Sequence, residues 1–221
     1  IKELKRRGGK LVVVDPRRTE TAQLASEHLF ITPGTDALFL LALLQTLFAE
    51  DLVDPGALSG FVTGLDTIAA ACADFTPEFA AAHTGVDAET TRRIARELAA
   101  AGAGICYGRM GVSTQAYGTL CQWAIQLLNI VTGNLDKPGG SLFTLPAVDQ
   151  VSSISPGGFG RHHSRVRKLP EFDRELPAAA MAEEITTPGE GQIRALFVGA
   201  GNPVLSTPNG RQLDTALAQL E

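Results

Sequence analysis

Three short apolar runs in the sequence have the length and flanking residues of buried strands. They are Leu11–Val14, which leads directly into Asp15, residues 103–108 (AGICYG), and residues 193–198 (IRALFV), which lead into a Gly-rich turn. Segments with helical periodicity separate them, and alternating strands and helices favour a parallel sheet. The predicted fold class is α/β: a doubly wound, mainly parallel, Rossmann-like sheet with part of a second α/β lobe.

Helices are predicted where apolar residues recur at helical spacing between residues that start and stop helices. Thr35 or Asp36 precedes a strongly apolar stretch that ends near Glu50, and Asp87 caps an amphipathic segment that closes at Gly102. Further helices are predicted at 1–8, as short segments within 52–83, at 118–133 and at 211–221. The pattern therefore places a helix after each predicted strand.

The spacing of these elements predicts three parts. Residues 1–145 form a dinucleotide-binding α/β lobe, and residues 190–221 form a strand–helix unit of a second lobe. Between them, residues 146–189 are rich in Gly, Pro, Arg and Ser and have weak periodicity, so a long irregular connection is predicted. The chain has no initiator Met and opens on what looks like the end of a helix, so we expect an internal fragment of a longer protein.

Composition narrows the classes of partner. The net charge of −5 gives no electrostatic reason to expect a nucleic acid. The three cysteines lie among apolar residues without metal-ligand spacing, which favours buried free thiols in a reducing compartment. No signal peptide opens the chain and no apolar run reaches the length of a membrane span. We expect a cytoplasmic protein, and export to the periplasm by an upstream signal stays open.

The first candidate site follows the first predicted strand. Ligands of open α/β sheets bind at the carboxyl ends of strands, where the Asp15 carboxylate could accept hydrogen bonds from ribose hydroxyls. Arg17 and Arg18 could bind phosphate, which guanidinium matches in geometry. A plain surface turn with solvated arginines explains the same residues equally well.

The second candidate is the loop Gly34-Thr35-Asp36. A loop carboxylate can accept hydrogen bonds from both the ring N–H and the exocyclic amine of guanine, which adenine cannot offer. Backbone N–H groups at a helix start add affinity for anions. An ordinary Thr or Asp helix cap is the alternative explanation.

Two Gly-rich turns are weaker candidates. Residues 108–119 (GRMGVSTQAYGT) and 199–209 (GAGNPVLSTPN) each follow a predicted strand and let backbone approach a ligand closely. Tight strand–helix turns are the alternative. His162 and His163 lack further ligands at metal spacing, so a metal site is not favoured there. The basic residues around them suggest either an anion-binding loop or a solvated face. The sequence contains no Ser-His-Asp constellation, no acid/base pair of carboxylates and no nucleophile elbow.

Four stretches taken in order resemble the prokaryotic molybdopterin oxidoreductases of the dimethyl sulfoxide reductase type, which include formate dehydrogenases and nitrate reductases. They are VVVDPRRTETAQLASEHLFITPGTDALFLLAL, GRMGVSTQAYGT, LLNIVTGNLDKPGG and GAGNPVLSTPN, and they cover about 10–145 and 190–215. The resemblance implies a molybdenum-dependent oxidoreductase that carries out two-electron redox chemistry on molybdopterin guanine dinucleotide, often bound in two copies around one molybdenum.

The resemblance also assigns residues. The nucleotide portion would lie along the strand-end loop and the guanosine at the G-T-D loop, while the third loop approaches the pterin and the G-N-P turn serves the second cofactor. The expected cofactor-binding residues are thus Asp15, Pro16, Arg17, Arg18, Thr19, Gly34, Thr35, Asp36, Met110, Gly111, Thr114 and Asn202. Many relatives have Gln-His where this chain has Thr114-Gln115.

Other parts of such an enzyme are expected elsewhere in the parent chain. The cysteine cluster for a [4Fe-4S] centre and the protein ligand to molybdenum would lie upstream, so no catalytic residue is assigned here and the fragment alone should be inactive. Expected partners are the remaining domains and electron-transfer subunits. The alternatives are a nicotinamide-dependent Rossmann-type dehydrogenase, which would need a GxGxxG loop that this sequence lacks, and a non-catalytic scaffold relative that lost the metal.

Overall fold

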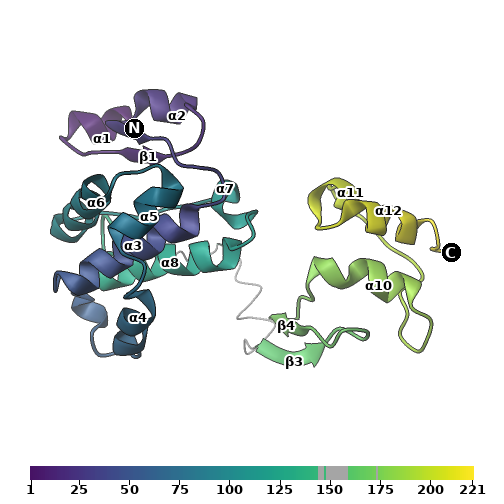
Figure 1. Ribbon diagram of the computed structural model, residues 1–221. Coiled ribbons are helices and arrows are strands. Elements are labelled where there is room, and N and C mark those ends of the chain that lie inside the picture. Colours follow the sequence, from purple (N-terminus) through teal and green to yellow (C-terminus); the bar gives the residue numbers. More distant parts are fainter. Residues whose placement is uncertain (144–146, 148–158, 173) are drawn as a thin grey trace. The chain divides into compact units, whose positions relative to one another are not determined.

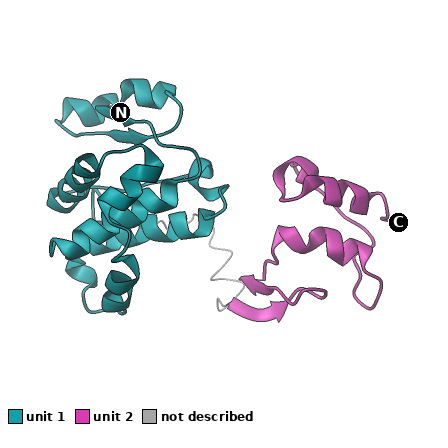
Figure 2. Ribbon diagram, viewed as in Figure 1, with its two compact units in different colours: residues 1–143 teal, residues 144–221 magenta. Residues whose placement is uncertain are grey.

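The chain folds into two compact units, which Figure 2 distinguishes by colour. Unit 1 is Ile1–Phe143 and unit 2 is Thr144–Glu221. The computed structural model describes residues 1–143, 147, 159–172 and 174–221. The domain boundary expected at residue 145 therefore falls outside the described residues. Each unit has its own apolar cluster and is described by itself.

A small parallel sheet forms one end of unit 1 (Figure 1). After α1 (Lys2–Arg6), β1 (Val12–Val14) pairs in parallel with β2 (Glu27–Leu29), and α2 (Glu20–Leu24) connects them. The strand predicted at 11–14 is confirmed, although it is half-buried. The sequence EHL of β2 gave no strand signal because two of its three residues are polar. Since the strands are parallel, both carboxyl ends lie at one edge of the sheet.

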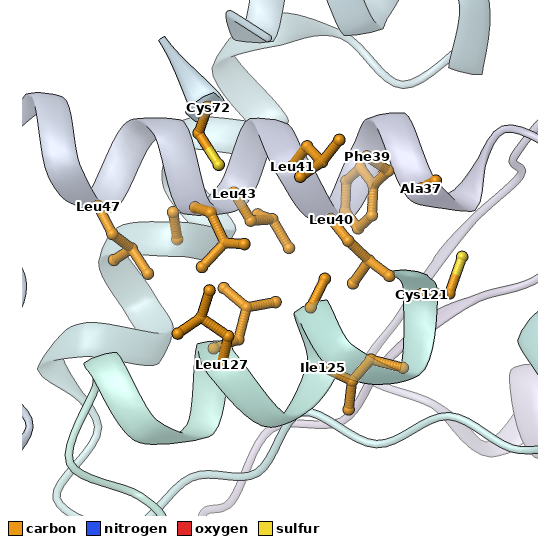
Figure 3. Packing of buried hydrophobic residues seen from close by; sticks show 14 of the residues in the cluster. Ala37, Phe39, Leu40, Leu41, Leu43, Leu47, Cys72, Cys121, Ile125 and Leu127 are labelled. Atoms are coloured by element: carbon orange, nitrogen blue, oxygen red, sulfur yellow. The ribbon is translucent and has the colours of Figure 1, made fainter. Parts of the chain in front are cut away.

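Helices build the core of unit 1. The long apolar helix α3 (Asp36–Ala49) packs against α8 (Gly118–Val131), and Figure 3 shows side chains such as Leu40, Leu127 and Ile125 filling the layer between them. Around this pair lie η1 (Gly56–Leu58), α4 (Leu65–Cys72), α5 (Pro77–Thr84), α6 (Ala88–Ala100) and the short α7 (Met110–Ser113). Both predicted long apolar helices are confirmed.

The amphipathic helix α6 begins as its sequence predicts. Asp87 is the N-cap, and its carboxylate accepts a hydrogen bond from the Thr90 backbone N–H at 2.8 Å. Ile94 and Leu98, four residues apart on one face, pack against the core. Capping and periodicity together therefore placed this helix to within a residue or two.

Residues 103–108 are a correction to the prediction. They do not form a strand, because no backbone neighbour in the described part of the chain pairs with them. Two buried asparagines hold the segment instead. Asn129 Oδ1 accepts from the Cys106 N–H at 2.8 Å while its Nδ2 donates to the Cys106 carbonyl, and Asn134 Oδ1 accepts from the Gly104 N–H at 3.0 Å. Side chains from α8 and from the turn that follows it thus take the place of a ladder.

Unit 2 differs from the predicted long irregular connection over 146–189. The described part of that range contains an antiparallel pair, β3 (Phe159–His163) and β4 (Pro170–Phe172), then η2 (Ala178–Ala180) and α10 (Met181–Thr186). Arg165 fixes the turn between the strands to α10, since its guanidinium donates to the carbonyl of Thr187 at 2.6 Å and pairs with Glu184. The irregular interpretation failed because such side-chain anchoring leaves no periodic signal.

The third predicted strand, at 193–198, is also wrong. The segment is irregular and Phe197 is 95% exposed, so no sheet partner in the described residues buries it. The chain continues into α11 (Pro203–Ser206) and α12 (Gly210–Leu217), and α12 packs on α10 through an apolar cluster that includes Ile185, Leu213 and Ala216. The final helix is confirmed.

The α/β class is confirmed at the level of mixed helices and a parallel sheet. In the described residues that sheet has only two strands, because the segments expected as its further strands are unpaired. The extended wound sheet of the prediction is therefore not seen in this part of the chain. No helix in these residues has both the length and the apolarity to cross a bilayer.

An ion-pair network ties the sheet of unit 1 to α6. Lys10 contacts Glu27 at 3.0 Å and Glu97 at 2.7 Å, and Arg93 pairs with the same two carboxylates. The hydrogen bond from Lys10 lowers the pKa of Glu97, an effect that partial burial opposes. The network therefore favours the folded state only while its carboxyl groups are ionised.

This network predicts a small loss of stability in acid. A carboxyl group with a lowered pKa stabilises the folded state above its ordinary value near 4.5, and that contribution is lost as pH falls through the lowered pKa. Because Lys10 and Glu97 are both about 40% exposed, the effect should be below about 1 kcal/mol. Urea unfolding between about pH 6 and 3 should show a weaker pH dependence in Glu97→Gln than in the wild type. An equal change in Glu20→Gln, a site without an ion pair in the described residues, would contradict this.

Candidate functional site

The strand-end loop Asp15–Thr19 leaves the carboxyl edge of the sheet. The Asp15 backbone N–H donates to the Leu29 carbonyl at 3.1 Å, and its carboxylate accepts from the Arg17 N–H at 2.7 Å. Its carbonyl lies 3.0 Å from His28 Nε2, which must carry the proton because a carbonyl only accepts. The carboxylate thus closes the turn of the chain while remaining at the sheet edge.

The basic residues of this loop face outward. Pro16, Arg17 and Arg18 are exposed, and neither arginine forms an ion pair with any residue that the structure describes. Thr19 caps α2, since its Oγ1 accepts from the Ala22 N–H at 3.2 Å. Two guanidinium groups next to a strand end are therefore available to an anionic ligand.

The loop Gly34-Thr35-Asp36 follows β2 and opens α3. Gly34 has φ +85°, a conformation that favours glycine, and a Cβ added there would meet nothing within 4 Å. Thr35 is the N-cap by position, but its hydroxyl donates to the Thr32 carbonyl at 2.7 Å and makes no capping bond. Asp36 is the first residue of α3, and its carboxylate accepts a hydrogen bond from Gln115, so no side-chain capping bond is formed at this helix start.

The third loop contains α7. Thr114 Oγ1 donates to the Met110 carbonyl at 2.8 Å, and Gln122 Nε2 donates to Ser113 Oγ at 2.8 Å, so both bonds hold the short helix in place. Met110 is 67% exposed, and a Cβ at Gly111 would meet no neighbour. The loop therefore presents an open surface of backbone and one flexible apolar side chain.

One hydrogen bond brings the second and third loops together. Gln115 Nε2 donates to Asp36 Oδ2 at 2.6 Å across 79 positions of sequence. Residues 30–35 join the carboxyl end of β2 to Asp36, and the strand-end loop leaves the same edge of the sheet from β1. Asn202 lies in unit 2, where it caps α11 by accepting from the Leu205 N–H at 3.3 Å.

The cysteines of unit 1 are not activated for covalent chemistry. Burial raises the pKa of the Cys106 thiol to about 11, and burial together with the Asp36 charge raises that of Cys121. Such thiols stay protonated at neutral pH. No cluster of His, Cys, Asp or Glu in the described part could hold a metal ion, and His162 and His163 are exposed.

Sequence interpretation missed two participants, Gln115 and His28. Gln115 lies within the third candidate loop, but nothing in the sequence pattern shows that its side chain reaches Asp36. His28 lies in the polar strand that the pattern did not reveal, so only the structure shows that it contacts Asp15.

The described part of unit 1 is a mixed α/β domain, with carboxylates and guanidinium groups at the end of a small parallel sheet. Comparison with models of known protein families identifies the family. The chain belongs to the molybdopterin oxidoreductases, whose family model matches residues 1–221. The resemblance found in the sequence is thereby confirmed at the level of the family. This is an oxidoreductase family, and membership implies a molybdenum–pterin cofactor.

Individual relatives agree with this assignment. The chain is 25% identical to the F420-dependent formate dehydrogenase subunit alpha of Methanocaldococcus jannaschii, covering 100% of this chain and 34% of that protein. It is 29% identical to a nitrate reductase of Symbiobacterium thermophilum, covering 96% of this chain and 31% of the relative. It therefore spans about a third of the length of these curated relatives.

A solved structure supports the fold. Acetylene hydratase from Pelobacter acetylenicus superposes with a TM-score of 0.57 at 26% identity, over 60% of this chain and 18% of that one.

Proposed function

We propose that unit 1 binds the guanine-bearing end of molybdopterin guanine dinucleotide within a molybdenum-dependent oxidoreductase. The observation that carries this proposal is the contact between Asp36 and Gln115, which joins the G-T-D loop to the loop of α7. Two loops singled out separately in the sequence thus form one surface. The family supports a molybdenum–pterin cofactor, and the guanine form is our inference from the residues.

The residues present fit such a group. Asp36 Oδ1 has no hydrogen-bond partner among the described residues, so the carboxylate can accept the paired N–H donors of guanine. Neither Gly34 nor Gly111 is covered by a neighbouring atom where a Cβ would stand, which leaves room for a ligand against the backbone. Arg17 and Arg18 can meet the diphosphate and Asp15 the ribose.

The remaining assignments extend the same proposal. Met110, Gly111 and Thr114 would face the pterin, while Asn202 of unit 2 would serve a second cofactor. When bound, the cofactor supplies two-electron redox chemistry at molybdenum. The residues of this chain bind and orient the nucleotide, and we assign none of them a step on the substrate. The metal ligand and a [4Fe-4S] cluster would come from other parts of the parent protein, so this chain alone should show no turnover.

A nucleotide-binding measurement tests the proposal. Isothermal titration calorimetry on the 221-residue chain should show GDP binding at least about tenfold tighter than ADP, since the carboxylate of Asp36 loses both base contacts with adenine. Asp36→Ala should remove this preference and leave the weak binding that the diphosphate provides. Equal affinity of the wild type for GDP and ADP would refute the guanine assignment.

Asp66→Ala supplies the matched control. Asp66 lies in the first turn of α4, as Asp36 does in α3, but away from the candidate loops in sequence. The control should retain the wild-type preference for GDP.

A further inference from the structure

Gln115 is the residue that joins the two loops of the proposed site. Its carboxamide nitrogen donates to Asp36 Oδ2 at 2.6 Å and to the Gly111 carbonyl at 2.8 Å. A carboxamide nitrogen carries two hydrogens, so both are in use. The carboxamide nitrogen of Gln115 is therefore bonded both to α7, through Gly111, and to the first residue of α3, Asp36.

Recognition of guanine makes a strict demand on a carboxylate. The ring N–H and the exocyclic amine of guanine are two parallel donors, and they need both carboxylate oxygens in one plane facing the base. The last torsion of an aspartate is broad, so a carboxylate on an open loop samples many planes. An orienting partner removes that freedom before the ligand arrives, and such pre-organisation favours tight and selective binding.

The geometry of the Asp36–Gln115 bond leaves the carboxylate able to bind a ligand. A carboxylate has about four acceptor positions on its two oxygens. Gln115 occupies one of them on Oδ2, and no described residue occupies Oδ1. The bond thus sets the plane of the carboxylate without using the positions that a base needs.

We propose that Gln115 is a positioning residue for base selectivity: by holding the Asp36 carboxylate in one plane, it makes the site select a purine with an exocyclic 2-amino group. The inference rests on the proposed function, since it assumes that Asp36 faces guanine. It adds a specific role for a residue that the sequence pattern left unassigned, in a position where this chain departs from its relatives.

Gln122 provides a matched control. Its carboxamide also anchors α7, donating to Ser113 Oγ at 2.8 Å, but it makes no contact with Asp36. Both residues are half-buried glutamines, and replacing either with methionine keeps the side-chain length while removing the donor. A loss caused only by a loosened α7 should appear in both variants, whereas a loss of carboxylate positioning should appear in Gln115→Met alone.

The test compares GDP, IDP and ADP by calorimetry on the wild type and these variants. IDP keeps the ring N–H of GDP but lacks the 2-amino group. The wild type should bind GDP about tenfold tighter than IDP, because one charge-assisted hydrogen bond separates them. Gln115→Met should weaken GDP binding about five- to tenfold and bring the GDP-to-IDP ratio to about two, with ADP unchanged. Gln122→Met should keep the wild-type ratio.

Several results would overturn the inference. If Gln115→Met keeps the wild-type ratio or binds GDP more tightly, Gln115 does not position Asp36. If Gln122→Met loses the ratio equally, the effect belongs to α7 as a whole. In these cases the wild type still prefers GDP over ADP and the proposed function stands. If the wild type shows no such preference, the proposed function fails and the role of Gln115 fails with it.

Discussion

Replacing Leu128 with alanine should lower the free energy of unfolding of unit 1 by about 3 kcal/mol. Leu128 lies on α8 and is fully buried in the core cluster that α3 and α8 share. Removing its branched end takes away buried apolar contacts and leaves a cavity that two packed helices cannot easily close. Urea unfolding followed by fluorescence measures the effect, because Trp123 is the only tryptophan in the chain and lies on the same helix.

Leu24 supplies the control for this experiment. It lies on α2 of the same unit and is 46% exposed, so Leu24→Ala should change the free energy of unfolding by no more than about 1 kcal/mol. Equal losses for the two leucines would mean that the layer between α3 and α8 is not the main source of stability in unit 1.

Replacing Asn129 with leucine should lower the same free energy by about 2–4 kcal/mol. The substitution removes both hydrogen bonds to the Cys106 backbone and leaves a peptide N–H and C=O without a partner where the segment is half-buried. Leucine keeps the heavy-atom count and branching of asparagine but is larger, so no cavity forms and the loss reports the unpaired backbone groups together with some overpacking. Hydrogen exchange should also show faster exchange of the Cys106 amide.

Gln126→Leu is the matched control, because Gln126 is exposed on the same helix. It should leave both the stability and the Cys106 exchange rate close to those of the wild type. Unchanged protection of the Cys106 amide in Asn129→Leu would contradict the role that we give to Asn129.

The helices were predictable because local chemistry determines them. Asp87 at a helix start and the apolar stretch from Ala37 to Ala49, interrupted only by Gln45 and Thr46, each contain enough information in adjacent residues to fix an element. The strands were less predictable from local sequence. An apolar run such as 103–108 looks the same whether its backbone pairs with a strand or with side chains, and the decisive residue, Asn129, lies more than twenty positions away.

The candidate site shows the same division. The G-T-D loop and the loop of α7 were each identified from glycine, hydroxyl and acidic residues close together in sequence. That Asp36 and Gln115 touch could not be predicted from the pattern, because the contact depends on how α3 and α8 pack. The polar strand β2 was missed for a related reason: pairing with β1, and not its own composition, makes it a strand.

The asparagine contacts at 103–108 also have a consequence for how the sequence can vary. Hydrogen bonds between two strands join backbone to backbone, so they place little restriction on which amino acids occupy the ladder. Here Asn129 and Asn134 supply the bonds from their side chains, and only a carboxamide of that length both donates and accepts at Cys106. Mutational tolerance in this region should therefore differ from that of a sheet. The exposed Ile105 on the bonded segment can change freely, whereas Asn129 on α8 and Asn134 just after that helix cannot.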